Sequence, residues 1–251
     1  MALSWSIRRQ LLYYAVTAVV GIIIVAGTWK VLFTRMPTCT DGIRNGDESG
    51  IDCGGSCLLL CAAEARVPLV LWARSFNSSP STYTAAAYVQ NPNPGAGARN
   101  VRYAFQLYDD KNVLVVEREG VIDLPPVRTI PIIEPNIDIG LRTVSRTLFT
   151  FADAPTWSKI IAEEGPILRL ADYELAADAS RLTAKLRNDG IRDAENVVVA
   201  AVLFDADGVA RAASKTLIDR VNRKSTEDII FTWGSGVEGI TRAEVTILPS
   251  F

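Results

Sequence analysis

Four cysteines provide the side chains in this sequence that are best suited to covalent or metal chemistry. They lie between residues 39 and 61, and none follows in the rest of the 251-residue chain. A segment this short and polar has almost no apolar interior, so covalent or metal links must hold it in one conformation. Cysteine pairs persist outside the reducing cytoplasm. We therefore expect disulfides among Cys39, Cys53, Cys57 and Cys61, with three pairings open.

Five side chains in the same segment carry oxygen atoms suited to a hard cation such as Ca²⁺, which collects about six to eight oxygen ligands. Their spacing departs from that of an EF-hand loop. Asn-Gly and Asp-Gly pairs also form tight turns, so a segment held only by disulfides explains the same residues. A zinc site of four thiolates is a third interpretation, although paired C-x2-C spacing is missing. The candidate calcium ligands are Asp41, Asn45, Asp47, Glu48 and Asp52.

The string from Cys39 to Cys57 reads Cys-x-Asp-Gly-x-x-Asn-Gly-x-Glu-x-Gly-x-Asp-Cys-Gly-Gly-x-Cys. It resembles a short cysteine motif that recurs in bacterial and some eukaryotic secreted or surface proteins. The resemblance covers about a tenth of the chain. It implies an extracellular location and no defined activity.

Several classes of function are disfavoured by composition. The chain has no histidine, which removes Ser-His-Asp and Cys-His nucleophiles and histidine zinc sites. No phosphate-binding, dinucleotide-binding or nucleophile-elbow motif occurs. The formal net charge of −2 lacks the basic excess that nucleic-acid binding needs. We therefore expect a protein that is not an enzyme and has no nucleic-acid partner.

Residues 11–33 form an apolar run in which Lys30 is the single charged residue. At about 1.5 Å rise per residue, this run crosses a hydrocarbon core of roughly 30 Å, whereas the apolar part of a signal peptide has about 7 to 15 residues. Tyr13, Tyr14 and Trp29 lie near its ends, where aromatic rings prefer the headgroups. We expect a transmembrane helix in contact with lipid. A long cleaved signal is the alternative.

Basic residues flank this run on both sides, so charge does not decide its orientation. The cysteines do, because their pairing requires an oxidising side of the membrane. We expect a single-pass protein of the cell membrane. Residues 1–10 form a cytoplasmic tail, and a cysteine-rich collar (residues 34–65) begins the extracytoplasmic part.

An internal repeat follows the collar. Residues 100–109 (NVRYAFQLYD) align with residues 196–205 (NVVVAAVLFD) at a constant offset of 96 residues. The same offset relates Ile122 to Ile218 and Arg146 to Arg242. We interpret this pattern as a tandem duplication, with one copy in residues 66–152 and the other in residues 165–251.

The alternating apolar and polar residues around Phe105 indicate a half-buried strand. About seven short strands per copy, separated by turn residues, predict a mainly β fold with two tandem antiparallel Ig-like β-sandwiches in a row after one N-terminal transmembrane α-helix. Residues 197–204 are apolar at every position, which indicates a strand covered on both faces or facing the neighbouring copy. Between the copies, residues 153–164 predict a short helical connector with Trp157, Ile160 and Ile161 on one face.

The segment Phe105-Gln-Leu107-Tyr108-Asp109 resembles the motif that names the FxLYD family, Ig-like domains of bacterial envelope proteins. The second copy retains only Leu203, Phe204 and Asp205 of this motif. The resemblance implies a structural role for the motif, a strand that runs into a turn.

These features together predict a non-enzymatic, membrane-anchored extracytoplasmic interaction or scaffold protein whose partners are other envelope proteins. The alternative is a structural subunit of a larger envelope complex of pilus or secretion type. Candidate binding surfaces are the loops at residues 91–98 and 74–81 and the edge strands.

Overall fold

The protein consists of one long helix, a short collar and a mainly β part. All strands of the described residues lie in the second of two compact units, Ser56–Phe251, whereas the helix and the first part of the collar lie in the first, Met1–Gly55. The structure is a computed structural model and describes residues 5–33, 37–160, 166–233 and 236–248.

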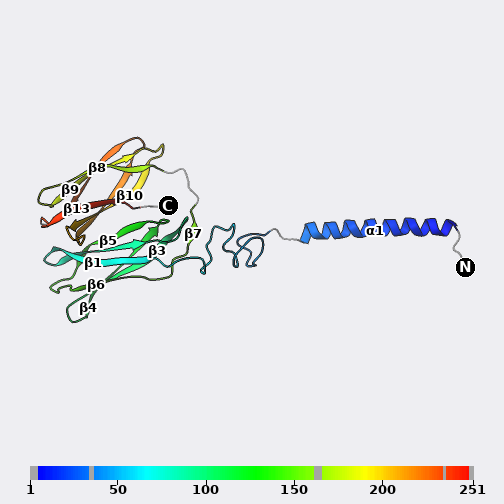
Figure 1. Cartoon of the computed structure of the whole chain (residues 1–251), viewed down its shortest axis with the longest axis horizontal. Coiled ribbons are helices and arrows are strands. Elements are labelled where there is room, and N and C mark those ends of the chain that lie inside the picture. The colour runs from blue at the N-terminus through cyan, green and yellow to red at the C-terminus, as the bar shows by residue number, and fades with distance from the viewer. Residues whose placement is uncertain (1–4, 34–36, 161–165, 234–235, 249–251) are drawn as a thin grey trace. The chain divides into compact units, whose positions relative to one another are not determined.

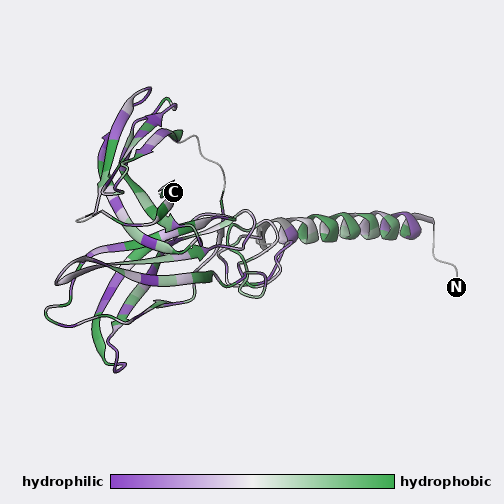
Figure 2. Ribbon diagram, turned by 60° about the vertical axis from the view of Figure 1, so that its left-hand side comes forward, coloured by the Kyte–Doolittle hydropathy of each residue, from purple (hydrophilic) through white to green (hydrophobic). Residues whose placement is uncertain are grey.

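Helix α1 spans Trp5–Phe33 and so begins six residues before the expected apolar run. Every side chain from residue 5 to residue 30 is exposed, although most of them are apolar. Figure 2 shows this apolar character along most of the helix. The helix is long and apolar enough to cross a membrane. A membrane anchor and a signal sequence both meet this criterion of length and composition.

The sequence predicts about seven strands in each copy of the repeat, and the described residues contain six in each. In the first copy they are β1 Leu69–Ser79, β2 Thr82–Gln90, β3 Ala96–Tyr108, β4 Leu114–Leu124, β5 Thr129–Asp138 and β6 Arg146–Phe151. In the second they are β8 Leu168–Leu175, β9 Arg181–Asn188, β10 Ala194–Asp205, β11 Ala210–Val221, β12 Thr226–Thr232 and β13 Ile240–Ile247.

Both copies have the same antiparallel topology. The first copy forms the sheets β1-β2-β5 and β4-β3-β6, and the second forms β8-β9-β12 and β11-β10-β13. Each strand of the second copy thus occupies the place of its counterpart in the first. The predicted fold of two antiparallel β-sandwiches after one apolar helix is confirmed (Figure 1).

The register repeats at the offset seen in the sequence. Val101 of β3 pairs with Ile122 of β4, and Val197 of β10 pairs with Ile218 of β11. The pairing of β3 with β6 and that of β10 with β13 are likewise related by 96 residues. A slip of one residue would exchange the two faces of a strand. The shared register therefore keeps equivalent side chains on equivalent faces.

Buried asparagines provide a second repeated feature, at an offset of 97 residues. Asn91 Nδ2 donates to the carbonyl oxygens of Ala96 and Pro125, each at 2.8 Å. In the second copy Asn188 Nδ2 donates to the carbonyl oxygens of Arg192 at 2.8 Å and Val221 at 3.2 Å. Both asparagines are almost fully buried. An amide that satisfies two buried carbonyl groups fixes the loop before the third strand of each sandwich.

The hairpin turns after β3 and β10 also share one design. The Asp109 carboxylate accepts hydrogen bonds from the backbone N–H groups of residues 111 and 113, at 3.0 and 2.8 Å. The Asp205 carboxylate accepts the same pair from residues 207 and 209, at the same distances. The carboxylate thereby replaces a turn hydrogen bond, which explains why an aspartate ends both strands.

Strand β10 contributes to two hydrophobic cores. Its odd-numbered side chains Val197, Val199, Ala201 and Leu203 belong to the core of the second sandwich. Its even-numbered side chains Val198, Ala200, Val202 and Phe204 pack in the same cluster as the core of the first sandwich. The all-apolar run is thus covered on both faces, as the sequence analysis expected.

The two sandwiches pack sheet against sheet. Strand β2 is buried on both faces like β10, and its small side chains Ala85, Ala86 and Ala87 have no exposed surface. Small side chains let two sheets approach closely. The sequence predicts sandwiches in a row, but the structure places the sheet β1-β2-β5 against the sheet β11-β10-β13, so four sheets form successive layers (Figure 1).

The expected helical connector is wrong for the part that the structure describes. Residues 153–160 contain no helix, and Ser158–Lys159 form the short strand β7, which pairs with the start of β3. Trp157 is buried in the first sandwich. Its carbonyl group accepts the N–H of Leu60 at 2.9 Å. Backbone partners on two sides favour an extended chain over a helix, and residues 161–164 of the expected helix, with Ile161, lie outside the described residues.

Candidate functional site

The cysteine-rich collar holds the residues that the sequence analysis singled out. Cys39, Cys53, Cys57 and Cys61 are all disulfide-bonded, which confirms the prediction of disulfides. Zinc binds the thiolate form of cysteine. Because all four sulfur atoms are joined in disulfides, the collar in this state offers no thiolate for the zinc site that the sequence left open.

The carboxylates of the collar bind its own backbone. Both oxygens of Asp52 accept the N–H of Gly42, at 3.1 and 2.9 Å. Glu48 is 8% exposed, and its Oε2 accepts the N–H groups of Asn45 at 3.2 Å and Asp52 at 3.3 Å. Asp41 Oδ1 accepts the N–H of residue 43 at 3.0 Å. These bonds hold turns in a segment without an apolar core, because carboxylates accept backbone N–H groups that have no partner in a helix or sheet.

The paired glycines of the collar have a geometric reason. Gly54 and Gly55 have φ angles of 75° and 52°, in the left-handed region. A Cβ atom on Gly55 would overlap the carbonyl oxygen of Asp47. Glycine permits both the backbone conformation and the close approach. The two glycines after Cys53 therefore allow the chain to form this turn.

One polar atom of the collar is buried without a hydrogen bond. Asn45 Nδ2 donates to Asp41 Oδ2 at 2.8 Å, which directs Asn45 Oδ1 away from that carboxylate. Asn45 Oδ1 is buried and has no hydrogen-bond partner among the described residues. The structure thus brings together Asp41, Asn45, Glu48 and Asp52 through hydrogen bonds, and Asp47 is exposed.

A second polar cluster lies between the two sandwiches, and the sequence analysis did not predict it. The carboxylate of Glu134 on β5 is mostly buried. It accepts hydrogen bonds from Tyr103 at 2.8 Å, from Lys215 at 3.3 Å and from Arg118 at 3.4 Å. Lys215 belongs to the second sandwich, whereas the other three residues belong to the first. This carboxylate therefore joins the two sandwiches through a charge pair.

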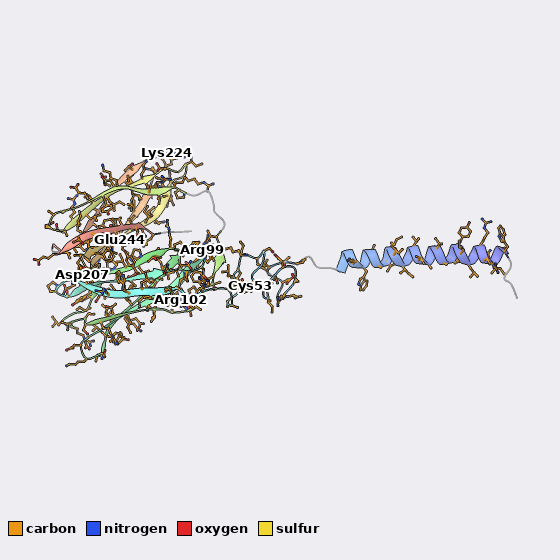
Figure 3. All side chains as sticks on the ribbon, viewed as in Figure 1. Cys53, Arg99, Arg102, Asp207, Lys224 and Glu244 are labelled. Carbon is orange, nitrogen blue, oxygen red and sulfur yellow. The ribbon has the colours of Figure 1, made fainter. Side chains whose placement is uncertain are left out.

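A tyrosine forms the other polar contact across the same interface. Tyr88 on β2 donates to Glu244 Oε2 on β13 at 2.7 Å (Glu244 is labelled in Figure 3). The Tyr88 ring also meets Phe204 edge to face, with 6.0 Å between ring centroids. Burial raises the pKa of Tyr88 and of Tyr103, and the adjacent carboxylates of Glu244 and Glu134 raise it further. Both phenols therefore remain protonated donors across the physiological pH range.

This interface joins the sandwiches through polar as well as apolar contacts. A cavity of about 270 Å³ lies beside Tyr103 and Lys215. Its described lining combines apolar side chains with the polar groups of Asp123, Asn100 and Asn196. Charged groups that satisfy one another across buried apolar surfaces fix one relative orientation, because a shifted arrangement would leave them unpaired.

The two loops expected as binding surfaces are built differently. Residues 74–79 belong to strand β1, so only the end of the expected 74–81 segment forms a turn. In the 91–98 segment, Asn91 and Asn93 are buried and Ala96 already begins β3. Asn93 holds the backbone of Arg66 through hydrogen bonds of 2.6 and 2.8 Å. This loop therefore anchors the chain that enters the first sandwich, and the edge strands remain as candidate surfaces.

Comparisons with known proteins identify no family. No family model matches the chain, and no curated protein matches its sequence. Among solved structures, the chain is similar to the N-terminal CBM22-1-CBM22-2 tandem domain of Xyn10C from Paenibacillus barcinonensis, at 6% identity. The match covers 73% of this chain and 86% of that one, with a TM-score of 0.16. A score this low carries no argument about function.

The missed residues share one property. Glu134 and Lys215 are 81 positions apart, and Tyr88 and Glu244 are 156 positions apart. No local spacing reveals a pair so distant in the chain. A single signal was present: Glu134 and Tyr88 interrupt apolar strands, and a polar residue in such a strand needs a partner.

Proposed function

We propose that this protein is a non-enzymatic, membrane-anchored module that presents two Ig-like β-sandwiches outside the cytoplasm and binds other envelope proteins. The observation that carries the proposal is the helix α1, whose apolar side chains are exposed along residues 5–30. Such a surface is stable in lipid and costly in water. The disulfide-bonded collar supports an extracytoplasmic position for the β part, since disulfides persist in oxidising compartments.

The FxLYD-type motif supports a structural role within this proposal. Phe105 and Leu107 are fully buried in the first sandwich. Asp109 begins the turn, where its carboxylate binds the backbone and pairs with Arg142 at 2.9 Å. The motif thus holds a strand and its turn in place. Binding of a partner must therefore use other surfaces of the sandwich, because a shared fold does not specify a shared function.

The rival function, a structural subunit of a larger envelope complex, would bury both the all-apolar strand at residues 197–204 and the apolar helix against partner subunits. Both faces of this strand are covered within the chain itself. The strand therefore needs no partner subunit to bury it. Helix α1 and the exposed apolar start of β1, with Leu69, Val70 and Leu71, are then the apolar surfaces through which a complex of this kind would assemble.

Gentle solubilisation followed by a mass measurement separates the two functions. We expect the full chain, extracted in a mild detergent, to have the mass of a monomer in a micelle and to recapture envelope proteins from a membrane extract. A stable large assembly that survives extraction would instead support the structural subunit.

We also propose that the collar binds Ca²⁺, on the strength of the buried oxygen Asn45 Oδ1, which lacks a hydrogen bond. The Glu48 carboxylate accepts the backbone N–H of Asn45 and would supply a charged ligand in the same turn. Calorimetry with CaCl₂ on the full chain tests this proposal, with Asn45→Ala as the variant and Asn77→Ala as the control. Asn77 is exposed on β1 and carries no side-chain hydrogen bond in the described structure. Binding heat that is lost only in Asn45→Ala is expected. No heat at millimolar Ca²⁺ would leave the collar as a turn held by disulfides.

A further inference from the structure

A pocket of about 420 Å³ lies where three edge strands meet. In the described strand orders, β1, β6 and β11 each stand at the end of a sheet. The pocket is lined by residues 73–76 of β1, residues 144–147 at the entry to β6, and Ala210 and Arg211 at the start of β11. Consecutive residues of a strand point to opposite faces. A pocket that touches four consecutive residues of β1 therefore runs along the edge of that strand and not over one face.

Each of the three edge strands contributes an arginine to this pocket. Arg211 Nε is paired with Asp205 Oδ2 at 2.6 Å. The Arg146 guanidinium lies over the Tyr108 ring, 5.1 Å from its centroid, and has no ion pair in the described structure. Arg74 is exposed and has neither a hydrogen bond nor an ion pair from its side chain among the described residues. Two of the three cations thus lack a carboxylate partner.

The other polar groups of the pocket are hydroxyls. Ser75, Ser145 and Thr147 line it, and Thr147 Oγ1 donates to Ser75 Oγ at 2.9 Å. None of the described lining residues is acidic. The chain as a whole carries a net charge of −2, so this concentration of positive charge is local. Guanidinium groups bind carboxylates through two parallel hydrogen bonds, and hydroxyls add donors to the same anion.

We propose that this pocket binds an extended acidic segment of a partner protein. An edge strand offers unpaired N–H and C=O groups that an extended peptide can pair with. Side chains on one face of such a peptide recur about every 6.6 Å, so acidic residues at alternate positions would all face the pocket that the arginines line. The proposal rests on the proposed function, because it names the class of partner that the displayed sandwiches bind.

The test measures peptide binding to the full chain in nanodiscs of zwitterionic lipid. The probe is a fluorescein-labelled octapeptide of alternating Glu and Thr, and the control peptide has Gln in place of Glu. Fluorescence anisotropy at low salt should show binding of the Glu peptide alone, and salt at about 0.5 M should weaken it because screening shortens the range of charge attraction.

Variants assign the binding to the pocket. Arg74→Gln should weaken binding about fivefold, as expected for the loss of one exposed charge pair, and Arg74→Lys should retain part of it. Arg128→Gln is the matched control, because Arg128 is exposed on the same sandwich, has no side-chain partner among the described residues and does not line the pocket. It should bind as the parent chain does. Both substitutions are at exposed positions, and unchanged thermal unfolding verifies that each variant is folded.

Three results would overturn the proposal. These are no binding of the Glu peptide, equal binding by the parent chain and Arg74→Gln, and full displacement of the peptide by inorganic phosphate or polygalacturonate at matched charge. The last result would show a general anion site. A failure here leaves the proposed function intact if the chain still recaptures envelope proteins. A β part found on the cytoplasmic side would overturn the proposed function and leave the peptide binding unaffected.

Discussion

Strand β10 allows a sharp test of the packing between the sandwiches, because neighbouring side chains enter different cores. Val199 and Val202 are both fully buried, Val199 in the core of the second sandwich and Val202 in the cluster shared with the first. Substitution by alanine removes two methyl groups. At about 1 kcal/mol for each buried methyl group, including the cavity left behind, either change should lower the free energy of unfolding by about 2 kcal/mol.

The two substitutions should differ in what they destabilise. Val199→Ala should lower the stability of the second sandwich, whereas Val202→Ala should weaken the contact between sandwiches and separate their unfolding transitions. Urea unfolding of the full chain in detergent, followed by tryptophan fluorescence, measures both. Trp72 and Trp157 report on the first sandwich, and Trp233 reports on the second.

An exposed valine provides the control for these measurements. Val121 on β4 is 56% exposed, so Val121→Ala should change stability by less than about 0.5 kcal/mol. If Val202→Ala behaves like Val121→Ala, the even-numbered face of β10 is not packed against the first sandwich. The sheet-on-sheet arrangement would then be refuted.

Three further predictions follow from single features of the structure. Leu107→Ala should cost about 2 to 5 kcal/mol in urea unfolding, because Leu107 is fully buried. Gln106→Ala should cost about 1 kcal/mol, because Gln106 is partly exposed and loses only hydrogen bonds to Glu117 and Tyr108; equal effects would mean a wrong register. Backbone N–H donors lower the pKa of Asp109 and Asp205. The stability that these carboxylates add is therefore complete above the ordinary carboxyl pKa of about 4 and is lost as pH falls through the lowered pKa values. A melting temperature that does not change from pH 6 to pH 2 would contradict this. Alkylation and mass spectrometry of the protein from its native membrane should find no free thiol, and modified cysteines without prior reduction would contradict the disulfides of the collar.

The internal repeat is the part of the fold that the sequence predicted most fully. The offset of 96 residues persists in the structure because the hairpin after Asp109 and that after Asp205 have the same length. The pair β3–β4 in the first copy and the pair β10–β11 in the second therefore have the same register. The alternation around Phe105 also identified the buried face correctly, since a half-buried strand has a period of two.

Contacts between strands that are distant in the chain could not be predicted from the sequence. The run from Val197 to Phe204 indicated two covered faces, but nothing local named β1-β2-β5 as the second cover. Ser158–Lys159 was expected in a helix because its neighbours have helical spacing. The N–H and C=O groups of these residues instead bond to the backbone of β3 and of the collar, and a helix would lose those bonds.

The candidate site shows the same division. The sequence identified the cysteines and the oxygen-bearing residues of the collar from type and spacing alone. It did not reveal that the carboxylates of Glu48 and Asp52 accept hydrogen bonds from backbone N–H groups, because the loop brings those groups close only when it is folded. The three arginines of the pocket lie on strands far apart in the chain, and only the packing of the sandwiches brings them together.

Protease accessibility tests the central claim most directly, that α1 anchors two sandwiches outside the cytoplasm. Spheroplasts of cells that express the full chain are treated with protease, and the fragments are detected with antibodies against the N-terminal tail and against the second sandwich. The proposed function predicts that the sandwich epitope is lost while the tail remains protected with the membrane. Protection of the sandwich epitope until the membrane is opened would contradict the proposal.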